Sequence, residues 1–241
     1  MTTGLTYTTY VQQIGTMAVI ADTSDANFQT LLPQMITYAE NRIYRDLDFL
    51  FTSVAITGNS LTIGNRSLTI PFQLQDNSGN IVVTEQINVL TDAGATRNPC
   101  LPTTKEFLDA VYGSSAAPNR ARPKFYVPFN DNVFLFGPVP DAAYPVEIVA
   151  TYRPNSLSAS NTSTFISTYL PDLFIMASMI YISAYQRNFG RANDDPQMAV
   201  TYESQYQALL KGAAVEEARK KQESSGWSSQ APSPVASPSR G

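Results

Sequence analysis

The chain has 241 residues, of which 43% are hydrophobic and 15% charged, and 16 Lys and Arg against 20 Asp and Glu give a net charge of −4. This length and apolar content fit one large or two small folded domains, and the acidic balance disfavours phosphate-driven nucleic-acid binding. The absence of histidine excludes Ser-His and Cys-His catalysis and His-ligated metal sites. The single cysteine, Cys100, excludes a disulfide or a zinc knuckle within one chain.

Helical periodicity predicts two helices near the N-terminus. Apolar residues recur every three or four positions over residues 7–18 and again over 28–47, and residues 22–25 separate the two patterns and offer caps. Pro33 lies inside the second pattern and lacks a backbone donor. We therefore expect a kink at Pro33 or a short separate turn before it.

Residues 49–156 have the composition of β-structure, rich in Thr, Val, Ile and Phe and punctuated by Gly, Pro and Asn. Strands are predicted at 67–74, 81–83, 86–89, 124–127, 133–136 and 146–152. The first three of these predict a hairpin over 66–90, with Pro71 favouring a sheet edge. Residues 104–108 fit a short helix or a strand. The spacing is typical of a small antiparallel sandwich or barrel.

Helical patterns return after residue 160. A short helix is predicted up to residue 169 with a cap within 161–164, then an apolar, buried helix over 171–185 and a last helix from 196 to 221. Glu216–Lys220 and Glu217–Lys221 have the spacing of stabilising pairs on that last helix. Residues 222–241 hold seven Ser, three Pro and the only tryptophan, Trp227, which is the composition of a flexible tail.

These patterns predict an α+β protein with a discontinuous helical part. We expect an antiparallel helix bundle with a β-rich, sandwich- or barrel-like domain inserted between its second and third helices. The expected segments are bundle helices at 1–48, the β-domain at 49–158, bundle helices at 159–221 and an extended arm at 222–241. No secretory signal or membrane-spanning stretch is expected, because the most apolar run, 173–182, is too short to cross a bilayer.

The sequence offers no evident catalytic, cofactor or metal site. Asp46 and Asp48 are two positions apart on a helix and point in different directions, and Cys100 has no neighbouring group that would activate it. A basic cluster at Arg120, Arg122 and Lys124 is either an ordinary charged loop or a contact for an acidic neighbour. The residues alone therefore indicate a structural or interaction protein.

Four ordered segments resemble the head-to-tail adaptor proteins of tailed bacteriophages. They are A-E-N-R-I-Y-R-D-L at 39–47, R-P-K-F-Y at 122–126, F-G-P-V-P-D at 136–141, and Y-R-P-N-S-L-S at 152–158 with P-D-L following at 171–173. The resemblance implies a helix bundle that carries a β-domain. It also implies a non-enzymatic subunit of a ring, usually twelvefold, that docks beneath the portal, receives the tail or nozzle protein and lines the DNA channel.

Further expectations follow from the resemblance. DNA would pass through the ring without sequence-specific binding, no cofactor or membrane would be involved, and the protein would assemble in the host cytoplasm into the head–tail interface of the virion. We expect Arg219, Lys220, Lys221 and Trp227 to contact the portal. Arg120, Arg122 and Lys124 would contact a neighbouring subunit or the tail.

Two other classes of function stay open. The first alternative is a receptor- or carbohydrate-binding β-module of a virion or tail, with the β-domain as its working surface. A carboxylate-dependent hydrolase ranks last, because it needs two acids that converge in one pocket.

Overall fold

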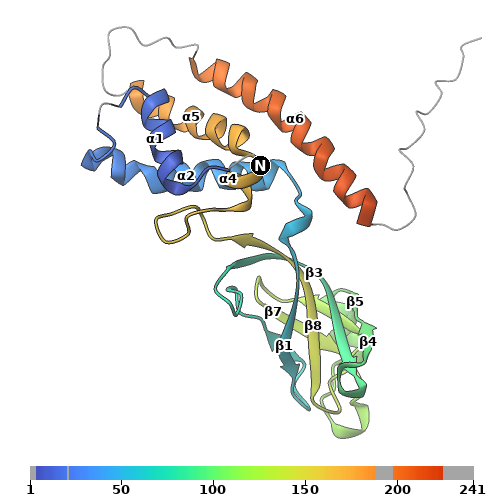
Figure 1. Cartoon of the computed structure of the whole chain (residues 1–241). Coiled ribbons are helices and arrows are strands. Elements are labelled where there is room, and N and C mark those ends of the chain that lie inside the picture. The colour runs from blue at the N-terminus through green and yellow to red at the C-terminus, as the bar shows by residue number, and fades with distance from the viewer. Residues whose placement is uncertain (1–3, 21, 188–197, 225–241) are drawn as a thin grey trace, which may run out of the picture. The chain divides into compact units, whose positions relative to one another are not determined.

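The computed structural model describes residues 4–20, 22–187 and 198–224. The chain divides into two compact units, one formed by Met1–Leu50 with Ser156–Gly241 and the other by Phe51–Asn155 (Figure 1). The described residues form six α-helices and two four-stranded sheets, which confirms the mixed α+β class. The insertion of the β-domain into an antiparallel bundle, and the four segment boundaries, stay predictions.

The helices of the first unit match the periodic patterns. They are α1 (Tyr7–Met17), α2 (Ala26–Asp46), α4 (Phe165–Tyr169), α5 (Pro171–Arg187) and α6 (Met198–Ser224). Side-chain caps fix several starts: Thr6 caps α1, the Asp25 carboxylate accepts the N–H groups of residues 27 and 28 before α2, and Thr164 caps α4. The start predicted at residue 196 for the last helix lies outside the described residues.

Helix α2 runs without interruption through Pro33, so the expected separate turn is wrong. A proline at this position removes one hydrogen bond of the helix. The buried residues of α2 lie on both sides of Pro33, from Phe28 and Leu32 to Ile36 and Ile43. Because burial of each such side chain contributes about 1.5–3 kcal/mol, packing outweighs the local cost of the proline.

Helix α5 is the centre of the helical unit, as its apolar sequence predicts. It contacts α1, α2, α4 and α6. Its Phe174 ring stacks on Tyr10 of α1 at 4.6 Å between ring centroids, and the Tyr10 hydroxyl lies 2.7 Å from Ser178 Oγ. A fully buried tyrosine thus keeps a hydrogen-bond partner for its one polar atom, which avoids the cost of an unpaired hydroxyl.

A polar cluster ties α6 to α2. The Arg42 guanidinium bonds Glu203 Oε1 at 2.6 Å and lies over the Tyr206 ring at 4.3 Å, while the Tyr206 hydroxyl donates to Asp46 Oδ2 at 2.7 Å. Arg42 holds the pKa of Glu203 below its usual range. Asp46 therefore has a structural role that sequence spacing alone did not reveal.

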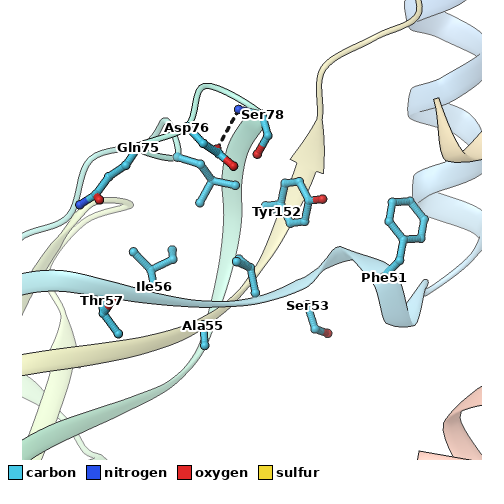
Figure 2. Close-up of a pocket in the computed structure, with 11 residues that line it drawn as sticks. Phe51, Ser53, Ala55, Ile56, Thr57, Gln75, Asp76, Ser78 and Tyr152 are labelled. Atoms are coloured by element: carbon cyan, nitrogen blue, oxygen red, sulfur yellow. Dashed lines mark hydrogen bonds between the residues drawn. The ribbon is translucent and has the colours of Figure 1, made fainter. Parts of the chain in front are cut away.

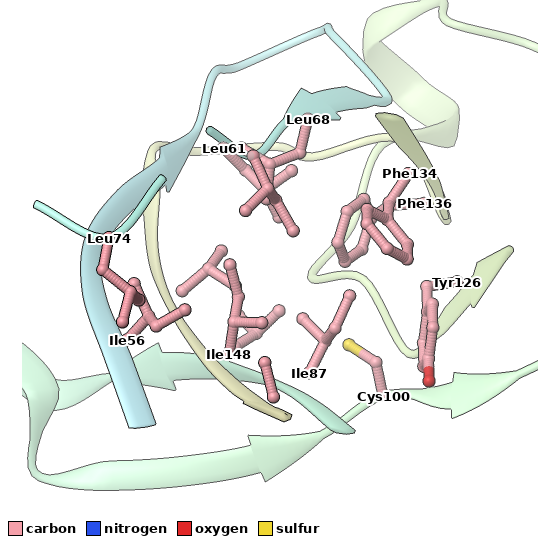
Figure 3. Packing of buried hydrophobic residues seen from close by; sticks show 14 residues of the cluster. Ile56, Leu61, Leu68, Leu74, Ile87, Cys100, Tyr126, Phe134, Phe136 and Ile148 are labelled. Atoms are coloured by element: carbon pink, nitrogen blue, oxygen red, sulfur yellow. The ribbon is translucent and has the colours of Figure 1, made fainter. Parts of the chain in front are cut away.

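The second unit contains two open sheets. The first has the order β1 (Ser53–Leu61), β8 (Tyr144–Pro154), β3 (Gly79–Thr91) and β4 (Thr96–Pro99). The second has the order β2 (Ser67–Thr69), β7 (Val133–Gly137), β6 (Phe125–Pro128) and β5 (Leu101–Pro102). Neither sheet closes on itself, so the barrel alternative is wrong. Side chains of both sheets share one apolar cluster that includes Ile56, Ile87, Ile148, Phe134 and Phe136 (Figure 3).

The predicted hairpin over 66–90 is wrong. The strands predicted at 124–127, 133–136 and 146–152 are confirmed, and the structure has them at 125–128, 133–137 and 144–154. Strand β2 pairs with β7 in the second sheet, whereas β3 pairs with β8 and β4 in the first. Only an isolated bridge between Gln73 and Asn80 remains of the hairpin. Pro71 interrupts the first strand because it has no N–H to donate, and the chain crosses between the sheets there.

Three strands and one helix of this unit were not assigned from the sequence. They are β1, β4, β5 and α3 (Lys105–Tyr112). The ambiguous segment 104–108 is helical, and the Thr104 side chain caps it by accepting the N–H of Phe107 at 3.3 Å. Leu108 of α3 packs with Val127 and Leu135 on the second sheet.

A buried carboxylate joins two of the segments that carried the family resemblance. Glu40 of α2 is only 2% exposed, and its Oε1 accepts the backbone N–H of Leu157 at 3.1 Å. Its Oε2 lies buried without a hydrogen-bond partner among the described residues. Burial raises the pKa of Glu40 to about 7, although the nearby hydroxyls of Ser156 and Thr164 favour the charged form. Glu40 thus holds the segment at 156–164 against α2.

Replacement of this carboxyl by an amide should change how stability depends on pH. The unfolded chain ionises Glu40 near pH 4.5 and the folded chain near pH 7, so the folded state binds more protons between these values. The contribution of Glu40 to the free energy of unfolding is therefore full below pH 4.5 and falls as the pH rises to 7. The loss is about 3 kcal/mol, at about 1.4 kcal/mol per pKa unit.

We expect Glu40→Gln to gain about 3 kcal/mol relative to the wild type between pH 4.5 and pH 8, because the amide cannot ionise. Urea unfolding at the two pH values measures this difference. Glu216→Gln, a change at an exposed residue of α6, is the matched control and should follow the wild type. A Glu40→Gln effect of equal size at both pH values would contradict the assignment.

Candidate interaction surfaces

The basic end of α6 lies in a cluster of charged and aromatic side chains of the helical unit. Lys220 Nζ lies 2.7 Å from Glu217 Oε1 and 3.0 Å from Glu216 Oε1, and 5.4 Å from the centre of the Phe165 ring. The Glu216–Lys220 pair is thus confirmed. Lys221 bonds Asp48. Both lysines therefore already hold carboxylates of their own subunit, and any partner would compete with these carboxylates.

Glu217 has a role that the helical spacing did not reveal. Its side chain is buried, and one carboxylate oxygen accepts the backbone N–H of Leu50 at 3.3 Å while the other accepts from Lys220. The last turns of α6 are thereby fastened to the end of the segment that follows α2. Arg219, between these fixed residues, is exposed.

An exposed aromatic residue lies beside this cluster. Tyr169, at the end of α4, is 67% exposed, and its ring lies 4.8 Å from that of Phe165, which Lys220 also contacts. Tyrosine and arginine are enriched in protein interfaces. Arg219, Lys220, Phe165 and Tyr169 form what we call the α4–α6 surface. A weak signal for Tyr169 is its place in the sequence, two positions before the P-D-L segment.

The three basic residues at 120–124 lie on one extended segment of the β unit. The backbone N–H of Lys124 bonds Gly137 at 2.9 Å, which fixes this segment beside the end of β7. Arg120 donates from Nε to the Ser115 carbonyl at 2.8 Å, and Lys124 is exposed. Arg122 is half-buried, and its Nε has no hydrogen-bond partner among the described residues. Backbone and side-chain hydrogen bonds thus hold this segment against the β unit, and one N–H of Arg122 is left unsatisfied.

A pocket of about 400 Å³ lies along β1, with Tyr152 of β8 and the loop at 74–78 on its other sides (Figure 2). The Asp76 carboxylate accepts the backbone N–H of Ser78 at 2.9 Å, and the hydrogen bonds from Ser78 hold its pKa below the usual range. Asp76 is the only acidic residue among the described residues that line this pocket. A two-carboxylate hydrolysis site is therefore not assembled here.

The remaining candidates have ordinary structural surroundings. Cys100 is buried, and burial raises the pKa of its thiol to about 11, so the group stays protonated at neutral pH. Trp227 lies outside the described residues. Within the described part of the chain, no cluster of three or more Cys, Asp or Glu side chains could hold a metal ion.

Comparison with known proteins identifies the family. The profile of the SU10 adaptor protein family matches residues 5–236, which is nearly the whole chain and includes all four segments quoted above. A search of curated proteins gives no match. None of the helices in the described ranges is long and apolar enough to cross a membrane. The chain therefore belongs to the SU10 adaptor proteins, a family of bacteriophage head-to-tail adaptors, and it is a structural component of the virion.

Proposed function

We propose that this protein is the subunit of a ring that docks beneath the portal, connects it to the tail or nozzle protein and surrounds the DNA channel. The observation that carries the proposal is the family match over residues 5–236. The excess of four acidic over basic side chains supports a channel through which DNA passes without binding. The protein would assemble in the host cytoplasm and then remain at the head–tail interface of the virion. It would not catalyse a reaction.

A closed ring needs two different surfaces on each subunit, because neighbouring subunits meet head to tail. We assign one subunit or tail contact to the segment with Arg120, Arg122 and Lys124. Its support is the exposed Lys124, whose positive charge can meet an acidic group of a neighbour.

The portal contact is assigned to the α4–α6 surface and the residues that follow it. Arg219 and Tyr169 are exposed there, whereas Lys220 and Lys221 already pair with carboxylates of the same subunit. Arg219 and Tyr169 therefore supply the larger part of this contact. Trp227 extends the contact, since a tryptophan in a polar segment gains apolar burial only when a partner covers it.

Reversal of the charge at Arg219 should weaken portal binding. Arg219→Glu is expected to lower the affinity for the cognate portal several-fold, and more at low salt, because the contact is electrostatic and only partly shielded from solvent. Lys211→Glu changes the same charge at another exposed position of α6 and is the control. Surface plasmon resonance at two salt concentrations measures both. Equal affinities of the two variants would remove Arg219 from the contact.

Truncation of the lone tryptophan should also weaken the complex. We expect Trp227→Ala to reduce the affinity for the portal at least tenfold, because an interface tryptophan is often a hot spot of binding. Gln230→Ala, in the same segment, should bind like the wild type. The fold should be unaffected, as judged by circular dichroism. Unchanged binding of Trp227→Ala would make this residue incidental.

A further inference from the structure

The β unit carries an apolar groove of about 720 Å³ between strand β3 and the end of strand β6. Four of its lining side chains are strongly exposed: Phe129 is 60%, Val83 53%, and Phe72 and Val82 each 51% accessible. Single exposed apolar residues are ordinary, but several of them around one groove mark a binding surface. The volume lies within the usual range of ligand-binding pockets, about 300–1,000 Å³.

One wall of the groove is a strand edge without a neighbour. Strand β4 pairs only with Asn88–Thr91 of β3, and the Ile81 N–H bonds Phe72 at the other end. Between these points, residues 82–86 of β3 pair on one side with β8 and face no other strand in the described part of the chain. An open edge with exposed valines attracts an extended segment of another chain.

The floor of the groove is aromatic. Tyr126 and Phe134 line it, with 6.0 Å between their ring centroids, and Pro102 and Pro128 lie beside them. Tyr126 is only 6% exposed, so its ring forms a packed apolar surface beneath the groove. Grooves with aromatic walls suit polyproline II segments, which present apolar proline rings.

The chain itself contains a segment with this chemistry. Residues 231–238 read A-P-S-P-V-A-S-P, and residues 225–239 carry no charged side chain. Prolines favour the polyproline II conformation and reduce the entropy lost on docking. Addition as a strand to β3 is less suitable, because Pro232, Pro234 and Pro238 have no N–H for the edge. We propose that residues 231–238 of a neighbouring copy dock in this groove.

That a neighbouring copy supplies the docking segment rests on the ring that we propose as the function. Six residues lie between Ser224, the last described residue of α6, and Ala231, and an extended chain of this length spans about 20–25 Å. In a ring, each groove would receive the segment of one neighbour. The same contact would then repeat around the ring until the ring closes. The segment would strengthen the contact between neighbouring subunits, and neither folded unit would need to be larger.

A labelled synthetic peptide of residues 229–241 tests the groove directly. The receptor is the full chain with Pro232→Ala, Pro234→Ala and Pro238→Ala, so that its own segment does not compete. We expect saturable binding, measured by fluorescence anisotropy, that weakens at least tenfold when Phe129→Ser is added. Val111→Ser, at an exposed position of α3 outside the groove, should leave the affinity unchanged. A peptide with the three prolines replaced by alanine should bind at least tenfold more weakly. Equal binding with and without Phe129→Ser, or by both peptides, would overturn the proposal.

A mixture of two full-length variants tests whether the docking segment comes from a neighbouring copy or from the same copy. The triple proline variant retains a groove, and Phe129→Ser retains the segment, so by sedimentation equilibrium the two should associate with each other at least tenfold more tightly than either associates with itself. A mixture that sediments as the sum of its parts would assign the segment to its own copy and overturn the contact between copies. Both variants keep Arg219 and Trp227, so portal binding measured separately reports on the proposed function and not on the groove.

Discussion

The helical unit depends on one buried carboxylate. Glu40 lies in the middle of α2, and its hydrogen bond to Leu157 fixes the segment that resumes the unit after the β-strands. A carboxyl group in such a place is costly when charged, and burial therefore raises its pKa to about 7. The same residue belongs to the A-E-N-R-I segment of the family resemblance. At Glu40 the resemblance coincides with a packing contact that holds two distant parts of the chain together.

A second buried acid organises the other end of the unit. Glu217 holds the Leu50 N–H and Lys220, and this arrangement leaves Arg219 exposed on α6. The α4–α6 surface is therefore built from residues whose partners within the subunit are already satisfied, with Arg219 and Tyr169 facing solvent. The contacts of Glu217 and Lys220 fix the backbone of α6 at this surface, which lowers the conformational entropy that binding would cost there.

Local signals in the sequence were sufficient for most elements, and long-range pairing was not. Helices α1, α2 and α5 follow from apolar periodicity, and β6 to β8 from alternation between turn residues. The hairpin over 66–90 failed because strand partners are chosen by the shared core, and β2 joins β7 rather than its neighbour in sequence. The break expected at Pro33 did not occur, because buried apolar side chains on both sides of it stabilise the continuous helix α2. For the candidate surfaces, the sequence located the basic residues but not the carboxylates that bind Lys220 and Lys221, because those contacts arise only in the folded unit.

Native mass spectrometry of the chain mixed with its cognate portal tests the central claim most directly. We expect a complex in which the chain joins the portal ring in one fixed stoichiometry, because every subunit of a closed ring makes the same contacts. Ring closure through identical contacts permits no broad distribution of copy numbers. A folded chain that fails to associate with the portal, or that binds in variable numbers, would contradict the role of a ring-forming adaptor beneath the portal.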